Sequence, residues 1–144
     1  MEALGMAGHL IRRLNQRSTQ VFTQRMREEG VDLTSVQFAA MDALATHPGI
    51  DQASVAGLIA YDRATIGGVI DRLVSKGYVA REVSKRDRRA REVRLTPRGQ
   101  EVFQTILPIV ADLQSNIMEG LSEAERATFL SLAAKVVTRD TEDA

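Results

Sequence analysis

Apolar residues recur every three or four positions over residues 6–29, a pattern that predicts a long amphipathic helix at the start of the chain. Gly30 follows this stretch and is a natural place for the helix to end. Thr34 and Gln37 then form a capping-box signature, so we expect a second helix to begin there and to end at His47-Pro48-Gly49. The apolar positions of the first helix are Ala7, Leu10, Ile11, Leu14, Val21 and Phe22.

Two shorter helices are expected next. One covers residues 52–59 with Asp51 as its cap, and the other covers residues 62–76 and is closed by Gly77. The second of them is amphipathic. Its apolar stripe consists of Ile66, Ile70 and Leu73, with Val69 and Val74 beside it. Its opposite face carries short side chains and one arginine, namely Ala64, Thr65, Gly68, Asp71, Arg72 and Ser75.

The hydrophobic period changes to two over residues 78–83 and 91–95, which predicts two strands joined by a polar, basic loop. Thr96-Pro97 then supplies a cap followed by proline, and opens a long helix in which Pro108 is expected to produce a kink. Ser122 and Glu125 form a second capping box before the last helix. The predicted fold is therefore mainly α (α+β): four helices, a β-hairpin and two helices, in the order ααα(α)ββαα. The apolar side of the last helix holds Phe129, Leu130, Ala133, Val136 and Val137.

Charge is balanced over the whole chain but not along it. The 144 residues contain 19 Lys+Arg and 19 Asp+Glu, and a length of this size is typical of one domain. Residues 81–98 nevertheless hold eight basic and three acidic residues, a net charge of +5, whereas residues 119–144 have a net charge of −3. A positive patch of this kind attracts phosphate groups, although a solvated charged hairpin would also explain it.

Several kinds of chemistry are excluded or disfavoured by composition. The chain has no cysteine, which excludes disulfides, thiolate nucleophiles and zinc sites built on cysteine. The two histidines, His9 and His47, have no nucleophile or metal partner at a useful spacing. We therefore expect no metal, no cofactor and no enzyme, and a small enzyme is only a remote alternative. The chain lacks a signal peptide and any apolar run of about 18 residues, so a cytoplasmic location without a membrane partner is expected.

A short helix, a tight turn and a second helix, followed at once by a basic hairpin, is the order of a winged helix-turn-helix. In this arrangement the second helix enters the major groove of DNA and the hairpin reaches the flanking backbone or minor groove. We expect base contacts from Thr65, Gly68 and Arg72 on the helix. Phosphate and minor-groove attraction are expected from Arg88, Arg89 and Arg91 in the hairpin.

Three residues of the predicted helix at 62–76 need an explanation beyond this pattern. Glycine inside a helix costs about 1 kcal/mol relative to alanine, and both Gly67 and Gly68 lie there. Close approach of DNA at Gly68 and helix packing at Gly67 are the two explanations. Asp71 is awkward on a surface facing DNA, so we expect it to pair locally with Arg72 or Ser75, or to accept a hydrogen bond from a cytosine amino group.

The segment from Asp87 to Gly99 is similar to the pattern D-x-R-x5-L-T-x-x-G of the multiple antibiotic resistance regulator (MarR) family. Ala60 departs mildly from the family, which often has glycine in this turn. The resemblance covers nearly the whole chain. Further matches are Leu33-Thr34 with Gln37, Val55-Ala56, Thr65-Ile66, Asp71-Arg72-Leu73 and Lys76-Gly77-Tyr78-Val79.

This resemblance implies a single MarR-like domain over residues 1–144 that forms a homodimer on double-stranded DNA with a palindromic operator. Interlocking dimerisation helices would lie at about 6–29 and 97–138, and the winged helix-turn-helix at about 33–96. Asp87 and Arg89 match a family pair that shapes the hairpin, so Asp87 would brace the wing. Arg88 and Arg91 match the tip arginines that enter the minor groove, and a purely structural wing is the alternative.

The resemblance also implies that a small phenolic or aromatic acid, or its thioester, releases the repressor from DNA. Residues 9–18 resemble the first helix of members that sense aromatic acids. Candidate ligand residues are Arg12, Arg13, Arg17 and Ser18, of which Arg12 and Ser18 match ligand-binding positions of some members. The arginines could instead form salt bridges in the dimer with Glu119 or Glu123. A constitutive or architectural DNA-binding protein without an effector is the alternative function.

Overall fold

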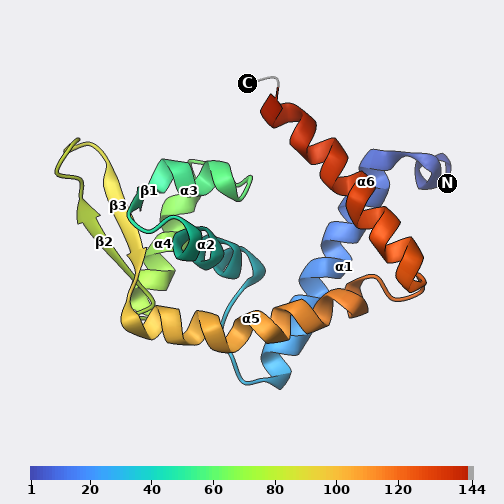
Figure 1. Cartoon of the computed structure of the whole chain (residues 1–144), viewed down its shortest axis with the longest axis horizontal. Coiled ribbons are helices and arrows are strands. Elements are labelled where there is room, and N and C mark those ends of the chain that lie inside the picture. The colour runs from blue at the N-terminus through green and yellow to red at the C-terminus, as the bar shows by residue number, and fades with distance from the viewer. Residues whose placement is uncertain (143–144) are drawn as a thin grey trace.

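The computed structural model describes residues 1–142 of the chain, with side chains for residues 1–139. This part of the chain is mainly helical, as the hydrophobic pattern predicts, and carries one small antiparallel sheet. Figure 1 shows the sheet with α2, α3 and α4 at one end of the molecule, while α5 runs across to α1 at the other end. The elements are η1 (Glu2–Gly5), α1 (Ala7–Glu28), α2 (Ser35–Thr46), β1 (Ile50–Asp51), α3 (Gln52–Leu58), α4 (Ile66–Ser75), β2 (Val79–Val83), β3 (Arg91–Leu95), α5 (Pro97–Ile117) and α6 (Glu123–Glu142).

The helix starts that were predicted from capping residues are confirmed. The hydroxyl of Thr34 accepts a hydrogen bond from the backbone N–H of Gln37, whose side chain accepts one from the backbone of Thr34. Asp51 caps α3 and Thr96 caps α5 through equivalent bonds to a backbone N–H three residues on. Such bonds satisfy N–H groups that the first turn of a helix leaves free. The helix α5 continues through Pro108.

The prediction of a two-stranded hairpin was incomplete, because the sheet has a third strand. The short strand β1 pairs with β3, with Ile50 opposite Val93, so the strand order is β1-β3-β2. Two residues are too few to show a period of two, and β1 exists because the chain between α2 and α3 passes along the free edge of β3. The 3₁₀ helix η1 was also not predicted.

The prediction that the fourth helix begins at Asp62 was wrong, because α4 begins at Ile66. The carboxylate of Asp62 accepts a hydrogen bond from the N–H of Ala64 at 2.9 Å, and the Thr65 hydroxyl donates to the Asp62 carbonyl at 3.2 Å. These bonds hold residues 62–65 in a turn, since an aspartate that binds its own neighbouring backbone competes with helix formation. Ala60, in the preceding turn, has a φ of +54°.

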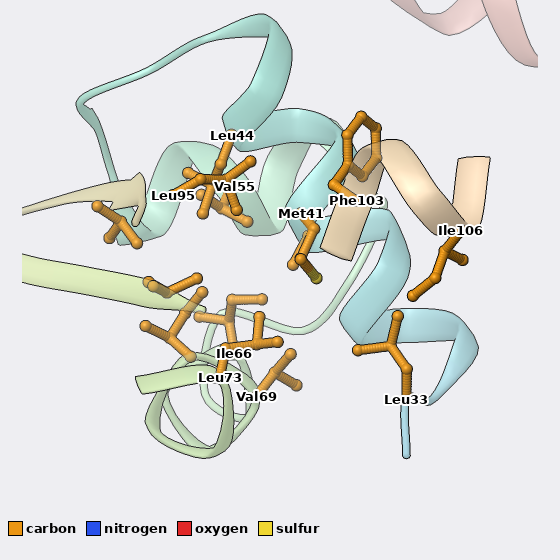
Figure 2. Close-up of a cluster of buried hydrophobic side chains, with 14 of the residues drawn as sticks. Leu33, Met41, Leu44, Val55, Ile66, Val69, Leu73, Leu95, Phe103 and Ile106 are labelled. Atoms are coloured by element: carbon orange, nitrogen blue, oxygen red, sulfur yellow. The ribbon is translucent and has the colours of Figure 1, made fainter. Parts of the chain in front are cut away.

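The hydrophobic core fixes α4 beneath the sheet and against α2. Figure 2 shows Ile66, Val69 and Leu73 of α4 grouped together, facing a second group in which Leu95 of β3 lies beside Leu44 of α2 and Val55 of α3. The predicted apolar stripe of α4 is thus buried, apart from Val74, which is 37% exposed. Phe103 and Ile106 extend the same core along α5, and the rings of Phe22, Phe38 and Phe103 join α1, α2 and α5 in a row.

The helices at the two ends of the chain keep apolar side chains in solvent. None of the α6 side chains described, which run to residue 139, is buried. On α1 the residues Leu10, Ile11 and Leu14 are 40–62% exposed. No helix among the described residues is long and apolar enough to cross a membrane. The exposed apolar residues of α6 are Phe129, Leu130, Leu132, Val136 and Val137.

Candidate nucleic-acid interface

The outer face of α4, which we call the recognition helix, is exposed. Thr65, Gly68 and Arg72 follow one another at helical spacing and are all exposed, opposite the buried Ile66 and Leu73 stripe. A Cβ added at Gly68 would meet no heavy atom within 4 Å. The three residues predicted to contact bases therefore lie together on one free surface, with only short side chains beside the arginine.

The two adjacent glycines of the recognition helix have different surroundings. A Cβ at Gly67 would lie 3.3 Å from Nε2 of Gln52 on α3, whereas Gly68 faces open space. Packing between α3 and α4 therefore accounts for Gly67 but not for Gly68. Both glycines lie in the first turn of α4, because the helix begins at Ile66, so their cost to the helix is lower than that of mid-helix glycines.

The β2–β3 hairpin, which we call the wing, has a tip at residues 84–90 that projects away from the rest of the chain (Figure 1). Asp87 bonds to the backbone of this tip, and not to the side chain of Arg89 as the resemblance suggested. Its carboxylate accepts a hydrogen bond from the backbone N–H of Arg89 at 3.0 Å. Ser84, which sequence reasoning missed, is buried and its hydroxyl accepts from the N–H groups of Arg86 and Asp87.

The arginines of the wing are free to meet an anion. Arg88, Arg89 and Arg91 are exposed, and none of them is within ion-pair distance of a carboxylate among the described residues. Two of the nearby acids are paired with other arginines, since Asp71 lies 2.7 Å from Arg81 and Glu92 lies 3.9 Å from Arg94, and residues 81–98 keep a net charge of +5. The surface around the wing is therefore positive although the chain as a whole has no net charge.

Asp71 does not pair with Arg72 or Ser75 as expected. Its carboxylate lies 2.7 Å from the guanidinium of Arg81 on β2, while the Ser75 hydroxyl donates to the Asp71 carbonyl. Packing of the sheet onto α4 brings Arg81 to this position, ten residues along the chain. Arg63, exposed in the turn before α4, is a further cation at this surface that the sequence patterns did not single out.

The residues predicted to bind a ligand lie on α1, away from the recognition helix. Arg17 is engaged within the chain, since it donates to the carbonyls of Ile117 and Asn116 at 2.8 and 2.9 Å and lies 3.7 Å from Glu119. Ser18 is half-buried. Arg12 and Arg13 are exposed, and among the side chains described neither has a hydrogen-bond or ion-pair partner.

Further along α1, Arg25 joins α5 at 3.0 Å from Asp112, and the hydrogen bonds that Arg25 donates to this carboxylate and to Glu29 raise its pKa. Arg25 and Arg17 thus hold α1 against the C-terminal half of α5. This pairing fixes the region that carries the ligand candidates to the long helix that leads to the wing.

An exposed recognition helix beside a positively charged hairpin, both mounted on one helical core, defines a winged helix-turn-helix DNA-binding protein. The MarR family model matches residues 33–90, which span α2, α3, α4 and the tip of the wing. The chain is 33% identical to the HTH-type transcriptional repressor NicR of Pseudomonas putida, covering 92% of this chain and 83% of NicR. The chain belongs to the MarR family of transcriptional regulators, and it is a regulator rather than an enzyme.

Solved structures agree with this assignment over almost the whole chain. BpsR of Bordetella bronchiseptica, whose DNA binding is regulated by 6-hydroxynicotinic acid, is 32% identical with a TM-score of 0.81, covering 90% of this chain and 97% of BpsR. A mutant form of MarR from E. coli, in complex with operator DNA, is 28% identical with a TM-score of 0.79. That match covers 90% of this chain and 91% of MarR.

Proposed function

We propose that this regulator is a homodimeric repressor that binds a palindromic operator with one winged unit on each half-site. The observation that carries the dimer is the exposed apolar surface of α1 and α6. Val136 and Val137 are 69% and 66% exposed, and isolated chains rarely leave such a surface in water. A second copy would bury it, and a two-fold axis would then present two recognition helices to DNA.

In this dimer, residues of about 6–29 and 97–138 form the dimerisation region and residues of about 33–96 form the DNA-binding unit. Light scattering at micromolar concentration should then give about twice the chain mass of 15.8 kDa. A folded monomer at this concentration would contradict both the dimer and the palindromic operator.

On the DNA, Thr65, Gly68 and Arg72 contact base edges in the major groove. Arg88, Arg89 and Arg91 contact phosphates or the minor groove, and Asp87 braces the loop that carries them. The exposure of all six residues supports their contact with DNA. Operator binding is tested by enriching a random DNA library on the protein, since a palindromic consensus is expected. Enrichment of no sequence would contradict the proposed function.

The proposed effector is a small aromatic carboxylic acid, or its thioester, that binds along α1 and releases the DNA. A groove of about 320 Å³ on α1 is lined by Leu10 and Leu14 together with Arg13 and Arg17. Apolar walls suit an aromatic ring, and a free guanidinium suits a carboxylate. Because Arg17 is occupied by α5 carbonyls, Arg13 and Arg12 are the available anchors, with Ser18 nearby on the same helix. The dependence of BpsR on 6-hydroxynicotinic acid also supports an effector of this class.

The effector is tested by titrating benzoate- and cinnamate-type acids, free and as thioesters, against the complex with the enriched duplex. At least one acid should release the DNA, and Arg13→Gln should weaken this response. Arg27→Gln, which removes an exposed arginine near the far end of α1, should leave the response unchanged. If no acid of a broad panel shifts DNA binding or the melting temperature, the protein is the constitutive DNA-binding alternative.

A further inference from the structure

One guanidinium group connects the recognition helix to the wing and to α3. Arg81 Nη2 on β2 lies 2.7 Å from Asp71 Oδ1 on α4. Its Nη1 donates a hydrogen bond of 3.3 Å to Oε1 of Gln52, the first residue of α3. The side chain of Arg81 is 27% exposed and that of Asp71 is 60% exposed. A single side chain of β2 thus contacts both helices of the helix-turn-helix.

Gln52 faces the same side of α4 as Arg81, because Gly67 and Asp71 lie one turn apart on one face of the helix. Its amide nitrogen lies where a Cβ on Gly67 would approach to 3.3 Å, while its amide oxygen accepts from Arg81. The amide is therefore held between the recognition helix and the wing. Rotation of α4 about its axis, or a tilt of β2, would break the contact to Gln52 or the ion pair to Asp71.

The relative orientation of these elements matters because α4 and the wing tip must enter neighbouring grooves together. The tip begins at Ser84, three residues beyond Arg81, which is about 10 Å along a strand. A tilt of about 15° at Arg81 would then move the tip by about 3 Å, which is the length of a hydrogen bond. The contact between Arg81 and Asp71 therefore controls where the arginines of the wing tip lie relative to α4, and hence which DNA geometry they fit.

Arg81 also neutralises a negative charge at the DNA-facing surface. Asp71 is exposed next to Arg72, and an unpaired carboxylate there would repel phosphate. With Arg81 at 2.7 Å, the pair contributes no net charge to this surface. Removing either partner therefore changes both the orientation of the wing and the local charge, and the two effects are separable by experiment.

We propose that Arg81 and Asp71 are positioning residues that set the angle between the recognition helix and the wing, and thereby determine sequence specificity without touching a base. This inference rests on the proposed DNA-binding function. It assigns a role in specificity to an arginine outside the groups predicted to contact DNA, and it explains why an acidic residue is tolerated on the recognition helix.

The test compares wild type, Asp71→Asn, Arg81→Gln and the double variant on two duplexes. One duplex is enriched from a random library by the wild type, and the other is a scrambled sequence of equal composition. Fluorescence anisotropy is measured over a salt series. Arg81→Gln should weaken binding to the enriched duplex about tenfold and to the scrambled one only two- to threefold, because the freed Asp71 repels both. Asp71→Asn should weaken binding to the enriched duplex but strengthen binding to the scrambled one slightly, because the freed Arg81 attracts phosphate.

The double variant separates positioning from charge. It should bind the scrambled duplex as wild type does, since neither charge remains, and its loss on the enriched duplex should not exceed that of the worse single variant. Reversal of the pair, Asp71→Arg with Arg81→Asp, should restore part of the specific affinity. Arg81→Lys keeps the charge next to Asp71 and should lie between wild type and Arg81→Gln.

Arg94→Gln is the matched control, because Arg94 is a strand arginine paired with Glu92 at 3.9 Å. It should change binding to both duplexes alike. Equal losses on the two duplexes for Arg81→Gln, or simple additivity in the double variant, would overturn the inference and leave Arg81 as a phosphate contact. Circular dichroism checks folding. If Arg81→Gln does not fold, Arg81→Lys and the reversed pair test the inference instead, through the ratio of their affinities for the enriched and the scrambled duplex. Failure of the wild type to enrich any sequence would contradict the proposed function instead.

Discussion

Replacing Gly68 by alanine adds one methyl group to the recognition helix and should have opposite effects on stability and on DNA binding. No heavy atom lies within 4 Å of the added Cβ, and the backbone there is helical. The methyl group therefore costs no packing energy. Glycine in a helix costs about 0.5–1 kcal/mol relative to alanine, and Gly68 is the third residue of α4, so we take the lower value of about 0.5 kcal/mol. The melting temperature should then rise by about 2 °C.

DNA binding should weaken, because the methyl group holds α4 away from the base edges. A Cβ extends about 1.5 Å from the helix backbone, which is enough to break hydrogen bonds that tolerate only a few tenths of an ångström. Loss of one well-formed base contact costs about 1.4 kcal/mol, within the range expected for a base contact, and corresponds to a tenfold loss of specific affinity. Gly68→Leu should abolish specific binding without unfolding the protein, since the position faces away from Ile66, Ile70 and Leu73.

The assay is fluorescence anisotropy on an enriched and a scrambled duplex, with thermal melts at one fixed protein concentration because dimers melt in a concentration-dependent way. Gly8→Ala is the matched control, because Gly8 also lies in the first turn of a helix and a Cβ there would meet no heavy atom within 4 Å. It should leave the ratio of affinities at the wild-type value. A more stable Gly68→Ala with an unchanged ratio would show that Gly68 does not face DNA. A lower melting temperature for Gly68→Ala would contradict the finding that Gly68 faces open space.

Four further outcomes are expected. Arg88→Ala should weaken binding to specific and random DNA by similar factors and reduce the log–log salt slope by about 0.9 per lost phosphate contact; an unchanged slope would make the wing purely structural. Ala60→Gly should raise the free energy of unfolding by about 0.5 kcal/mol in chemical denaturation, because the left-handed φ of +54° costs alanine about 1 kcal/mol and glycine's greater freedom in the unfolded chain offsets part of this. Gly99→Ala should lower it by about 2 kcal/mol or more, since its Cβ would collide with the backbone carbonyl of Tyr78; a neutral effect would contradict this packing. Hydrogen bonds from the backbone N–H and the hydroxyl of Ser122 hold the pKa of Glu125 below its ordinary 4.5. The ionised Glu125 therefore stabilises the first turn of α6 above that pH, and this stabilisation is lost as the pH falls through the pKa of the folded state. Amide exchange in this turn should accelerate on acidification in wild type and depend less on pH in Glu125→Gln.

Most of the local structure could be predicted from the sequence, because its determinants are close together along the chain. A capping box joins residues three apart, as at Thr34 and Gln37, so the signal and the bond lie in the same few residues. The burial of Ile66, Ile70 and Leu73 follows from their helical spacing alone. The surface placement of Gly68 and Arg72 follows from the same period, so this part of the candidate site was accessible from the pattern, whereas Thr65 lies in the turn before α4.

The tertiary structure decided what depends on residues that are distant in sequence. The strand β1 forms only because β3, some forty residues later, offers it an edge. The partner of Asp71 is Arg81 rather than Arg72, because packing of the sheet onto α4 brings β2 within 2.7 Å of the carboxylate. Gly99 shows no local reason to be glycine until α5 packs against the carbonyl of Tyr78. Periodicity reports which face of an element is apolar, but the partner that this face meets is set by the three-dimensional packing of the whole chain.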